Sequence, residues 1–181
     1  MPHHKHHDLC NADGHCCAVA FPSELGWMAM AGHDEVLCRL TFGHSTRVAA
    51  LKALGPPPAF HPAQAGWNHA LVARLQAYAA GGYDEFHDVR IALDGLTAFQ
   101  RRLLECCRRI PYGTTLSYAE LATRAGCPRA VRAVGNCMAG NRIPLIVPCH
   151  RVIRADGRLG GYSAPGSLRT KRRLLELERR N

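Results

Sequence analysis

The sequence predicts an α/β N-terminal domain, a small antiparallel sheet with helices, followed by a mostly α C-terminal domain with a helix-turn-helix. Three observations lead to this fold class. β-like runs alternate with short helices before residue 95, two helix-capping boxes follow it, and the charge changes sign between the halves. Residues 1–98 hold 6 Lys or Arg and 9 Asp or Glu, a net charge of −3. Residues 99–181 hold 17 and 5, a net charge of +12, which favours a phosphate-bearing partner for this half.

The N-terminal domain is expected over residues 21–94. Residues 27–31 and 36–42 are β-like runs around the turn residues 32–35, which predicts a hairpin. Alternation would place four side chains of the second run on one face: Val36, Cys38, Leu40 and Phe42. Apolar spacing predicts one helix through Val48, Leu51 and Leu54, and another through Leu71, Val72, Leu75 and Tyr78. Residues 89–93 predict a last strand.

The C-terminal domain is expected over residues 95–181. Thr97 with Gln100, and Ser117 with Glu120, have the spacing of capping boxes at helix starts. A third helix is predicted over residues 129–139, with Pro128 in its first turn. The small residues Ala130, Ala133 and Gly135 make this helix slim, which suits close entry into a nucleic-acid groove. The alternative is tight packing against other helices.

The first 20 residues are rich in His and Cys, have little periodicity, and predict a flexible segment. They contain donor atoms for zinc, but their spacing matches no ligand pattern, so a tag or a tail is preferred over a structural metal site. Residues 1–7 lack the apolar core of a secretory signal, and no apolar run in the chain approaches about 18 residues. Nine cysteines without a Cys-x-x-Cys pattern favour a reducing, cytoplasmic compartment.

The candidate reactive group is Cys149, which follows Pro148 and the apolar run 143–147, expected to be a buried strand. A thiol needs a base or a positive neighbour to ionise near neutral pH. His150 is adjacent, but neighbouring side chains of an extended segment point in opposite directions, so a relay through water or a bend is expected. Glu178 falls on the apolar stripe of the last helix, where a carboxylate needs a partner. A thiol–imidazole–carboxylate triad follows, with Glu176 as a competing carboxylate that faces away.

Several short motifs surround this candidate triad. They are Ile110-Pro111-Tyr112-Gly113-Thr114-Thr115, Ser117-Tyr118, Arg132-Ala133-Val134-Gly135, Asn141, Pro148-Cys149-His150-Arg151-Val152 and Gly161-Tyr162. In this order they resemble the methylated-DNA–protein-cysteine methyltransferases, also called O6-alkylguanine-DNA alkyltransferases. The resemblance covers residues from about Phe99 to Glu178, and the N-terminal half fits the family's variable α/β domain only in outline.

The resemblance implies the chemistry and its residues. Cys149 would irreversibly accept the alkyl group of O6-alkylguanine, and thymine methylated at O4 is the second substrate to consider. His150 and Glu178 would activate the thiol through water, Tyr118 would stabilise the departing guanine, and Asn141 would hold the turn before the active-site segment. The substrate pocket would be lined by Tyr118, Met138, Pro144, Val152, Tyr162 and Ser163. The segment 163–167 is about two residues longer than the link that the family usually has at this place. This difference affects the rim of the substrate pocket.

The resemblance also implies partners. The slim helix would enter the minor groove of double-stranded DNA, with Arg132 filling the gap left by a flipped base. The other expected DNA contacts are Ala130, Ala133, Gly135, Thr114, Ser117 and Arg151. We expect no cofactor, no metal ion and no membrane association, and a monomer that acts once. The expected location is the cytoplasm near the nucleoid or, in a eukaryote, the nucleus.

Three other functions remain open from the residues alone. A non-catalytic, alkyltransferase-like protein would flip damaged guanine without chemistry, but such relatives lack the reactive cysteine. A cysteine hydrolase would use the same triad but leaves the basic helix-turn-helix unexplained. A transcriptional role would be added to repair, although no activator domain is visible.

Overall fold

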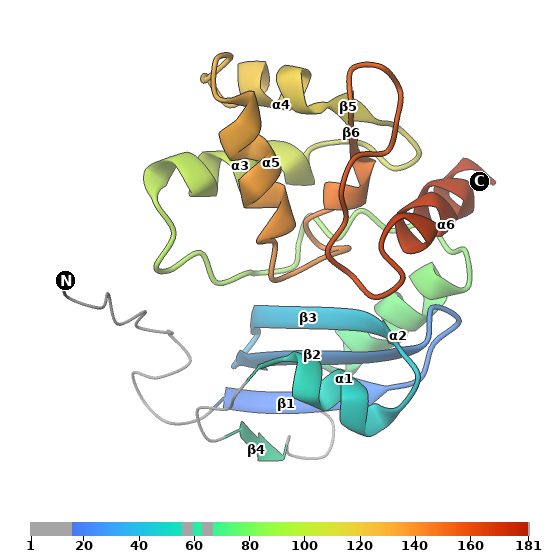
Figure 1. Cartoon of the computed structure of the whole chain (residues 1–181). Coiled ribbons are helices and arrows are strands. Elements are labelled where there is room, and N and C mark those ends of the chain that lie inside the picture. The colour runs from blue at the N-terminus through green and yellow to red at the C-terminus, as the bar shows by residue number, and fades with distance from the viewer. Residues whose placement is uncertain (1–15, 56–59, 63–66, 181) are drawn as a thin grey trace.

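The N-terminal half is built on a four-stranded sheet with the strand order β3-β2-β1-β4. Figure 1 shows the computed structural model, which describes residues 16–55, 60–62 and 67–180. Strands β1 (Cys16–Phe21), β2 (Trp27–His33) and β3 (Val36–His44) are antiparallel, which confirms the predicted sheet. Strand β4 (Phe60–Pro62) adds a parallel edge beside β1. Residues 16–20 belong to β1, so the prediction of a flexible segment is wrong for them, and residues 1–15 lie outside the described ranges.

The β2–β3 hairpin forms at the predicted turn, but an extra residue in β3 close to this turn changes which side chains are buried. Ala31 pairs with Arg39, whereas the next residue, Gly32, pairs with Leu37. Such a bulge interrupts the strict alternation of faces. Leu37, Leu40 and Phe42 are therefore buried, while Val36 and Cys38 are only half-buried, which corrects the expected face.

Two helices cover the two faces of the sheet. Helix α1 (Arg47–Ala53) packs Ala50 and the following Leu54 against Ala29 and Ala31, while Val48 is 74% exposed and was wrongly placed on its buried stripe. Helix α2 (His69–Ala79) buries the four residues predicted for it, Leu71, Val72, Leu75 and Tyr78, against the opposite face. The predicted strand at residues 89–93 is wrong: the chain makes only an isolated bridge there, between Leu37 and Ile91.

The C-terminal half contains the predicted helix-turn-helix. Helices α3 (Ala98–Arg108) and α4 (Tyr118–Arg124) both begin with a complete capping box, at Thr97 and Ser117. Helix α5 (Val131–Ala139) begins two residues later than predicted, because residues 127–130 form a turn in which the Ala130 N–H donates to the Cys127 carbonyl. Short strands β5 (Leu116–Ser117) and β6 (Val152–Ile153) pair in parallel, and helix α6 (Leu168–Arg179) closes the chain.

The two halves share a hydrophobic core. The inner face of the sheet and α2 pack against Ile143, Leu145, Ile146 and Leu174 from the C-terminal half. Figure 1 shows the two halves meeting across the middle of the molecule, where the loop that leads into α6 comes down to β3. A second core, between α3, α4 and α5, contains Cys149 itself. The active-site segment therefore lies between two packed cores.

Candidate active site

Cys149 lies on a series of tight turns rather than at the end of a strand. The Val147 N–H donates to the Ile143 carbonyl, Leu145 has a φ of +73°, and Cys149 opens a short 3-10 helix, η2 (Cys149–Arg151). The predicted buried strand over residues 143–147 is therefore wrong, although burial itself is confirmed for Val147 and Ile146. Pro144 and Pro148 lack the N–H groups that a central strand would use. Cys149 is 4% exposed.

Asn141 fixes the turn and touches the thiol. Its Nδ2 donates to the Val147 carbonyl at 2.8 Å and to Cys149 Sγ at 3.1 Å, while its Oδ1 accepts from the Ile143 N–H at 3.0 Å. The turn-holding position was expected, whereas the contact with sulfur was not. A donor aimed at Sγ favours the thiolate over the thiol.

His150 and Glu178 are brought together as predicted. His150 Nε2 lies 2.9 Å from Glu178 Oε1, and both side chains are buried. Because Nε2 faces a carboxylate, it is assigned the proton, which leaves Nδ1 as the basic nitrogen. Within the described ranges Nδ1 is buried without a hydrogen-bond partner, and no bond joins His150 to Cys149. The arrangement suits a relay through a water molecule between Nδ1 and the thiol.

Glu178 is the centre of a buried hydrogen-bond network. It accepts from Arg151 Nε and Nη2, from the Gly113 N–H at 3.1 Å, and from the Tyr78 hydroxyl at 2.6 Å. Burial opposes ionisation of this carboxyl, but His150 and Arg151 outweigh it and hold its pKa well below the usual value. Glu178 is therefore a carboxylate at neutral pH and orients the imidazole.

Arg151 is part of this network and not of the surface. It is 1% exposed, and its Nη1 donates to the Ile110 carbonyl at 2.6 Å. The expectation that Arg151 contacts DNA is thus wrong in this structure, because a buried guanidinium satisfied by a carboxylate cannot reach a phosphate. Sequence position suggested exposure, and only the tertiary pairing with Glu178 accounts for the burial.

Lys171 is a functional candidate that the sequence reasoning missed. Its Nζ donates to the carbonyls of Val152 at 2.6 Å and Leu159 at 2.5 Å, and it lies 5.7 Å from the centre of the Tyr118 ring. Burial lowers the pKa of Lys171 to about 8. The available signal was helical spacing, because Lys171 precedes the buried Leu174, Leu175 and Glu178 by three, four and seven residues. Leu168, three residues before Lys171, is 46% exposed and does not belong to this buried stripe.

The other predicted pocket residues gather near the thiol. Tyr118, Met138, Val152 and Tyr162 all pack in or against the core that contains Cys149. A side chain at Gly160 would stand 3.0 Å from the Tyr118 ring, so the chain after β6 lies directly on this tyrosine. Pro144, Tyr162 and Ser163 line a cavity together with Asn141, and this cavity continues to β3 of the N-terminal half.

Burial sets the ionisation of the reacting groups. It raises the pKa of the Cys149 thiol, an effect that the Asn141 hydrogen bond and the Lys171 charge oppose. It also lowers the pKa of His150 below its usual value of 6.5, despite the hydrogen bond that His150 donates to the Glu178 carboxylate. The imidazole is therefore neutral near pH 7 and is able to take a proton from the thiol.

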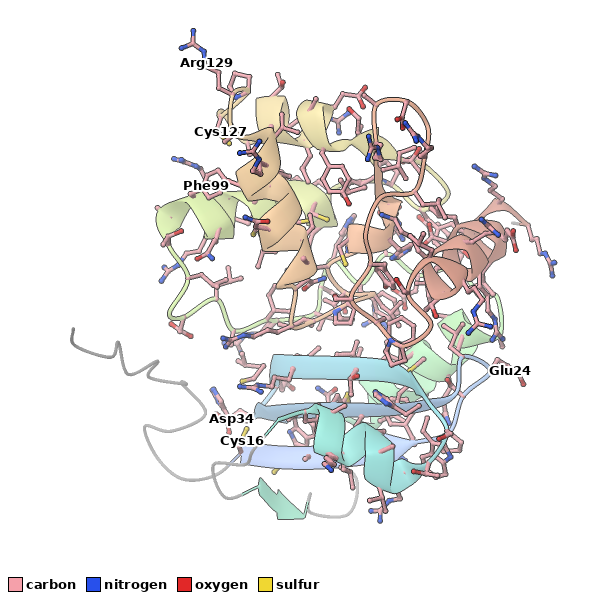
Figure 2. The ribbon with its side chains drawn as sticks, viewed as in Figure 1. Cys16, Glu24, Asp34, Phe99, Cys127 and Arg129 are labelled. Atoms are coloured by element: carbon pink, nitrogen blue, oxygen red, sulfur yellow. The ribbon has the colours of Figure 1, made fainter. Side chains whose placement is uncertain are left out.

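The expected DNA-contact residues, apart from Arg151, lie at the surface or close to it. Arg132, Ala133 and Thr114 are exposed, and Ala130, Ser117 and Gly135 are half-buried. A Cβ built on Gly135 would meet no atom within 4 Å, so this face of α5 is open to an approaching partner. In Figure 2 Arg129, just before α5, points outward from the helix-turn-helix end of the molecule.

The fold and the site define a DNA-binding type of protein that carries a reactive thiol beneath its helix-turn-helix. Residues 98–180 match the family model described as 6-O-methylguanine DNA methyltransferase, DNA binding domain. The chain belongs to the family of methylated-DNA–protein-cysteine methyltransferases.

Individual relatives support this membership. The chain is 40% identical over 165 residues to the methylated-DNA–protein-cysteine methyltransferase of Mycolicibacterium paratuberculosis, covering 88% of this chain and 90% of the relative. The corresponding protein of Mycobacterium bovis is 44% identical over 157 residues, covering 87% and 88%. A crystal structure of the Mycobacterium tuberculosis O6-methylguanine methyltransferase superimposes with a TM-score of 0.75 at 39% identity, covering 91% of this chain and 93% of that one.

No helix within the described ranges is long and apolar enough to cross a membrane. In the same ranges no three His, Cys, Asp or Glu side chains are arranged to hold a metal ion. Most of the His- and Cys-rich segment considered for zinc, residues 1–15, lies outside the described residues.

Proposed function

We propose that this chain repairs DNA by moving the alkyl group of O6-alkylguanine to its own Cys149. The observation that carries the proposal is the position of Sγ: it lies behind the helix-turn-helix, 3.1 Å from Asn141 Nδ2 and next to the His150–Glu178 pair. A similar structure, the Mycobacterium tuberculosis protein in complex with DNA, superimposes with a TM-score of 0.73 at 40% identity. Double-stranded DNA is the partner that the basic C-terminal half fits.

The reaction is a single displacement. The proton of Cys149 passes through water to His150 Nδ1, and the thiolate attacks the carbon bonded to the guanine O6. The S–C bond forms while the C–O bond breaks, and the electron pair of the C–O bond stays on guanine. Tyr118 stabilises this departing base by donating a hydrogen bond to it, and the base takes its proton from solvent as it leaves. The product thioether is a poor leaving group, so each molecule reacts once.

The remaining residues prepare the reactants. Arg132 on α5 fills the space of the flipped nucleotide, while Thr114, Ser117, Ala130, Ala133 and Gly135 follow the minor groove. Met138, Pro144, Val152, Tyr162 and Ser163 enclose the base together with Tyr118. The Val152 carbonyl accepts from Lys171, and its second lone pair is able to accept from the guanine amino group. The protein acts as a monomer in the compartment that contains the DNA. O4-methylthymine is a second substrate to test.

The test is the mass of the intact protein after incubation with a duplex that contains O6-methylguanine. We expect a gain of one methylene on Cys149 and one turnover per molecule. Cys149→Ala should abolish the gain and leave affinity for the duplex nearly unchanged, and Arg132→Ala should slow transfer from duplex.

Two other results would decide against this function. An unchanged mass with retained lesion binding would support the non-catalytic, lesion-binding alternative. Repeated turnover would support a hydrolase.

A further inference from the structure

A hairpin-like turn, residues 154–158 (the hairpin tip), follows the active-site segment. After β6, the Gly157 N–H donates to the Arg154 carbonyl at 3.0 Å and the Arg154 N–H donates to the Arg158 carbonyl at 2.8 Å. Gly157 has a φ of +79°, the left-handed conformation that glycine adopts without strain after a tight turn. The tip is closed by backbone hydrogen bonds, so its two arginines are held at a fixed spacing in solvent.

The hairpin lies on the helix-turn-helix side of the molecule. Strand β6, from which it rises, pairs with β5, and β5 ends at Ser117, the N-cap of α4. Figure 1 shows the loop after β6 reaching the level of α4, at the end of the molecule where α5 begins. The tip also lies near the pocket: Gly160 packs on the Tyr118 ring, and the charge of Arg154 acts to lower the pKa of Tyr118, against the larger effect of burial.

One carboxylate holds both arginines of the tip. Asp156 accepts from Arg158 Nε at 2.8 Å and from the Arg158 N–H at 3.1 Å, and Arg154 Nε lies 3.4 Å from the same carboxylate. The arginine side chains are 56% and 75% exposed. Ion pairs this exposed are weak and easily exchanged for another anion. Two cations share one anion, which leaves the tip with an uncompensated positive charge.

We propose that Arg154 and Arg158 bind the phosphates of the DNA backbone beside the pocket mouth, and that Asp156 holds them in place until phosphate displaces it. A guanidinium forms paired hydrogen bonds with phosphate oxygens as readily as with a carboxylate, so the exchange needs little rearrangement. Arg132 on α5 is exposed on the same end of the molecule. The recognition helix and the hairpin would then contact the DNA strand at two places around the flipped nucleotide. The inference rests on the proposed function only in naming DNA as the partner.

The test measures affinity for an unmodified duplex by fluorescence anisotropy at several salt concentrations. Arg154→Ala and Arg158→Ala should each weaken binding about 3- to 10-fold and lower the slope of log affinity against log salt by about 0.9, the value for one phosphate contact. Asp156→Asn, which keeps an acceptor for the Arg158 N–H but removes the charge, should tighten binding. Arg47→Ala on α1 is the matched control, because Arg47 is exposed and lies in the N-terminal half.

The proposal is overturned if both arginine variants of the hairpin match Arg47→Ala in affinity and in salt slope, or if Asp156→Asn weakens binding. Transfer from the free base O6-methylguanine, which has no phosphate, should proceed at the wild-type rate in all three hairpin variants. Loss of that reaction would mean that the tip shapes the pocket, and would also overturn the proposal. If wild-type protein transfers no alkyl group at all, the proposed function fails, while the binding data on unmodified duplex still decide the role of the hairpin.

Discussion

The Tyr78 hydroxyl, on α2 of the N-terminal half, donates a hydrogen bond of 2.6 Å to Glu178 Oε1, near the end of α6. The same hydroxyl lies 3.4 Å from His150 Nε2, and Tyr78 is 1% exposed. The carboxylate that orients the candidate base is thus held by side chains from both halves of the chain. The N-terminal half, which has no catalytic pattern of its own, contributes directly to the position of the reacting groups.

Tyr78→Phe should lower stability and slow alkyl transfer while leaving the fold intact. The substitution removes one hydrogen bond to a charged group, worth about 1.5–3 kcal/mol, and keeps the ring in its packed position. Urea unfolding and transfer from the free base measure the two effects. A positioning role predicts a slower transfer at saturating base and a shifted pH profile. Leu75→Val on the same buried face of α2 is the control for packing alone, and equal transfer rates in the two variants would contradict the role.

Glu178→Gln should destabilise the protein by about 3–5 kcal/mol, because it leaves the Arg151 guanidinium buried without its counter-ion. The double variant Arg151→Met, Glu178→Gln should recover part of this loss, since neither charge is then buried alone. Both should transfer slowly, because His150 loses the carboxylate that orients it. Chemical denaturation of the two variants gives the comparison, and a double variant less stable than Glu178→Gln would refute the pairing.

Alkyl transfer should persist below pH 6.5 and be lost on further acidification. Burial lowers the pKa of His150, so the neutral base remains present below the pH at which an exposed histidine becomes protonated. As the pH falls through this lowered pKa, the imidazole gains a proton and can no longer accept one from the thiol. The rate of single-turnover transfer from the free base against pH gives the profile. A midpoint above 6.5 would contradict the assignment of His150 as the base.

Gly160→Ala should slow transfer more than Gly126→Ala, a substitution at a glycine with a similar φ. Gly160 and Gly126 both have positive φ, +69° and +74°, so alanine at either position adds about 1–2 kcal/mol of backbone strain. Only at Gly160 would the new Cβ stand 3.0 Å from the Tyr118 ring, whereas Gly126 has no atom within 4 Å. Transfer from the free base, which needs no DNA contact, should fall in Gly160→Ala and stay near wild type in Gly126→Ala. Equal rates would show that the contact with Tyr118 has no functional part.

Local sequence signals predicted much of the fold because their causes are local. The capping boxes at Thr97 and Ser117, the turn before β3 and the buried stripe of α2 depend on neighbouring residues, and all are present. The pairing of His150 with Glu178 was also accessible, because a carboxylate on an apolar stripe requires a partner.

The features that were missed depend on contacts between distant residues. An extra residue in β3 shifts its buried face, and nothing in the alternation of that strand marks where the bulge falls. The run at residues 143–147 reads as a strand, but Leu145 at positive φ and the bonds of Asn141 fold it into turns. Arg151 and Tyr78 converge on Glu178 from 27 and 100 residues away. Side-chain type alone assigns an arginine to the surface and a tyrosine to the core.

The shared core changes how substitutions in the N-terminal half should be interpreted. Ile143, Leu145 and Ile146, which lie three to six residues before the reactive cysteine, pack on the inner face of the sheet. A side chain such as Met30 or Phe42, fully buried there, supports the backbone on which the thiol is mounted. Variants at such positions never meet DNA and carry no chemical group of the reaction. They would nevertheless be recovered in a genetic screen as repair-deficient, and distance from Cys149 is a poor guide to which variants of this chain are harmless.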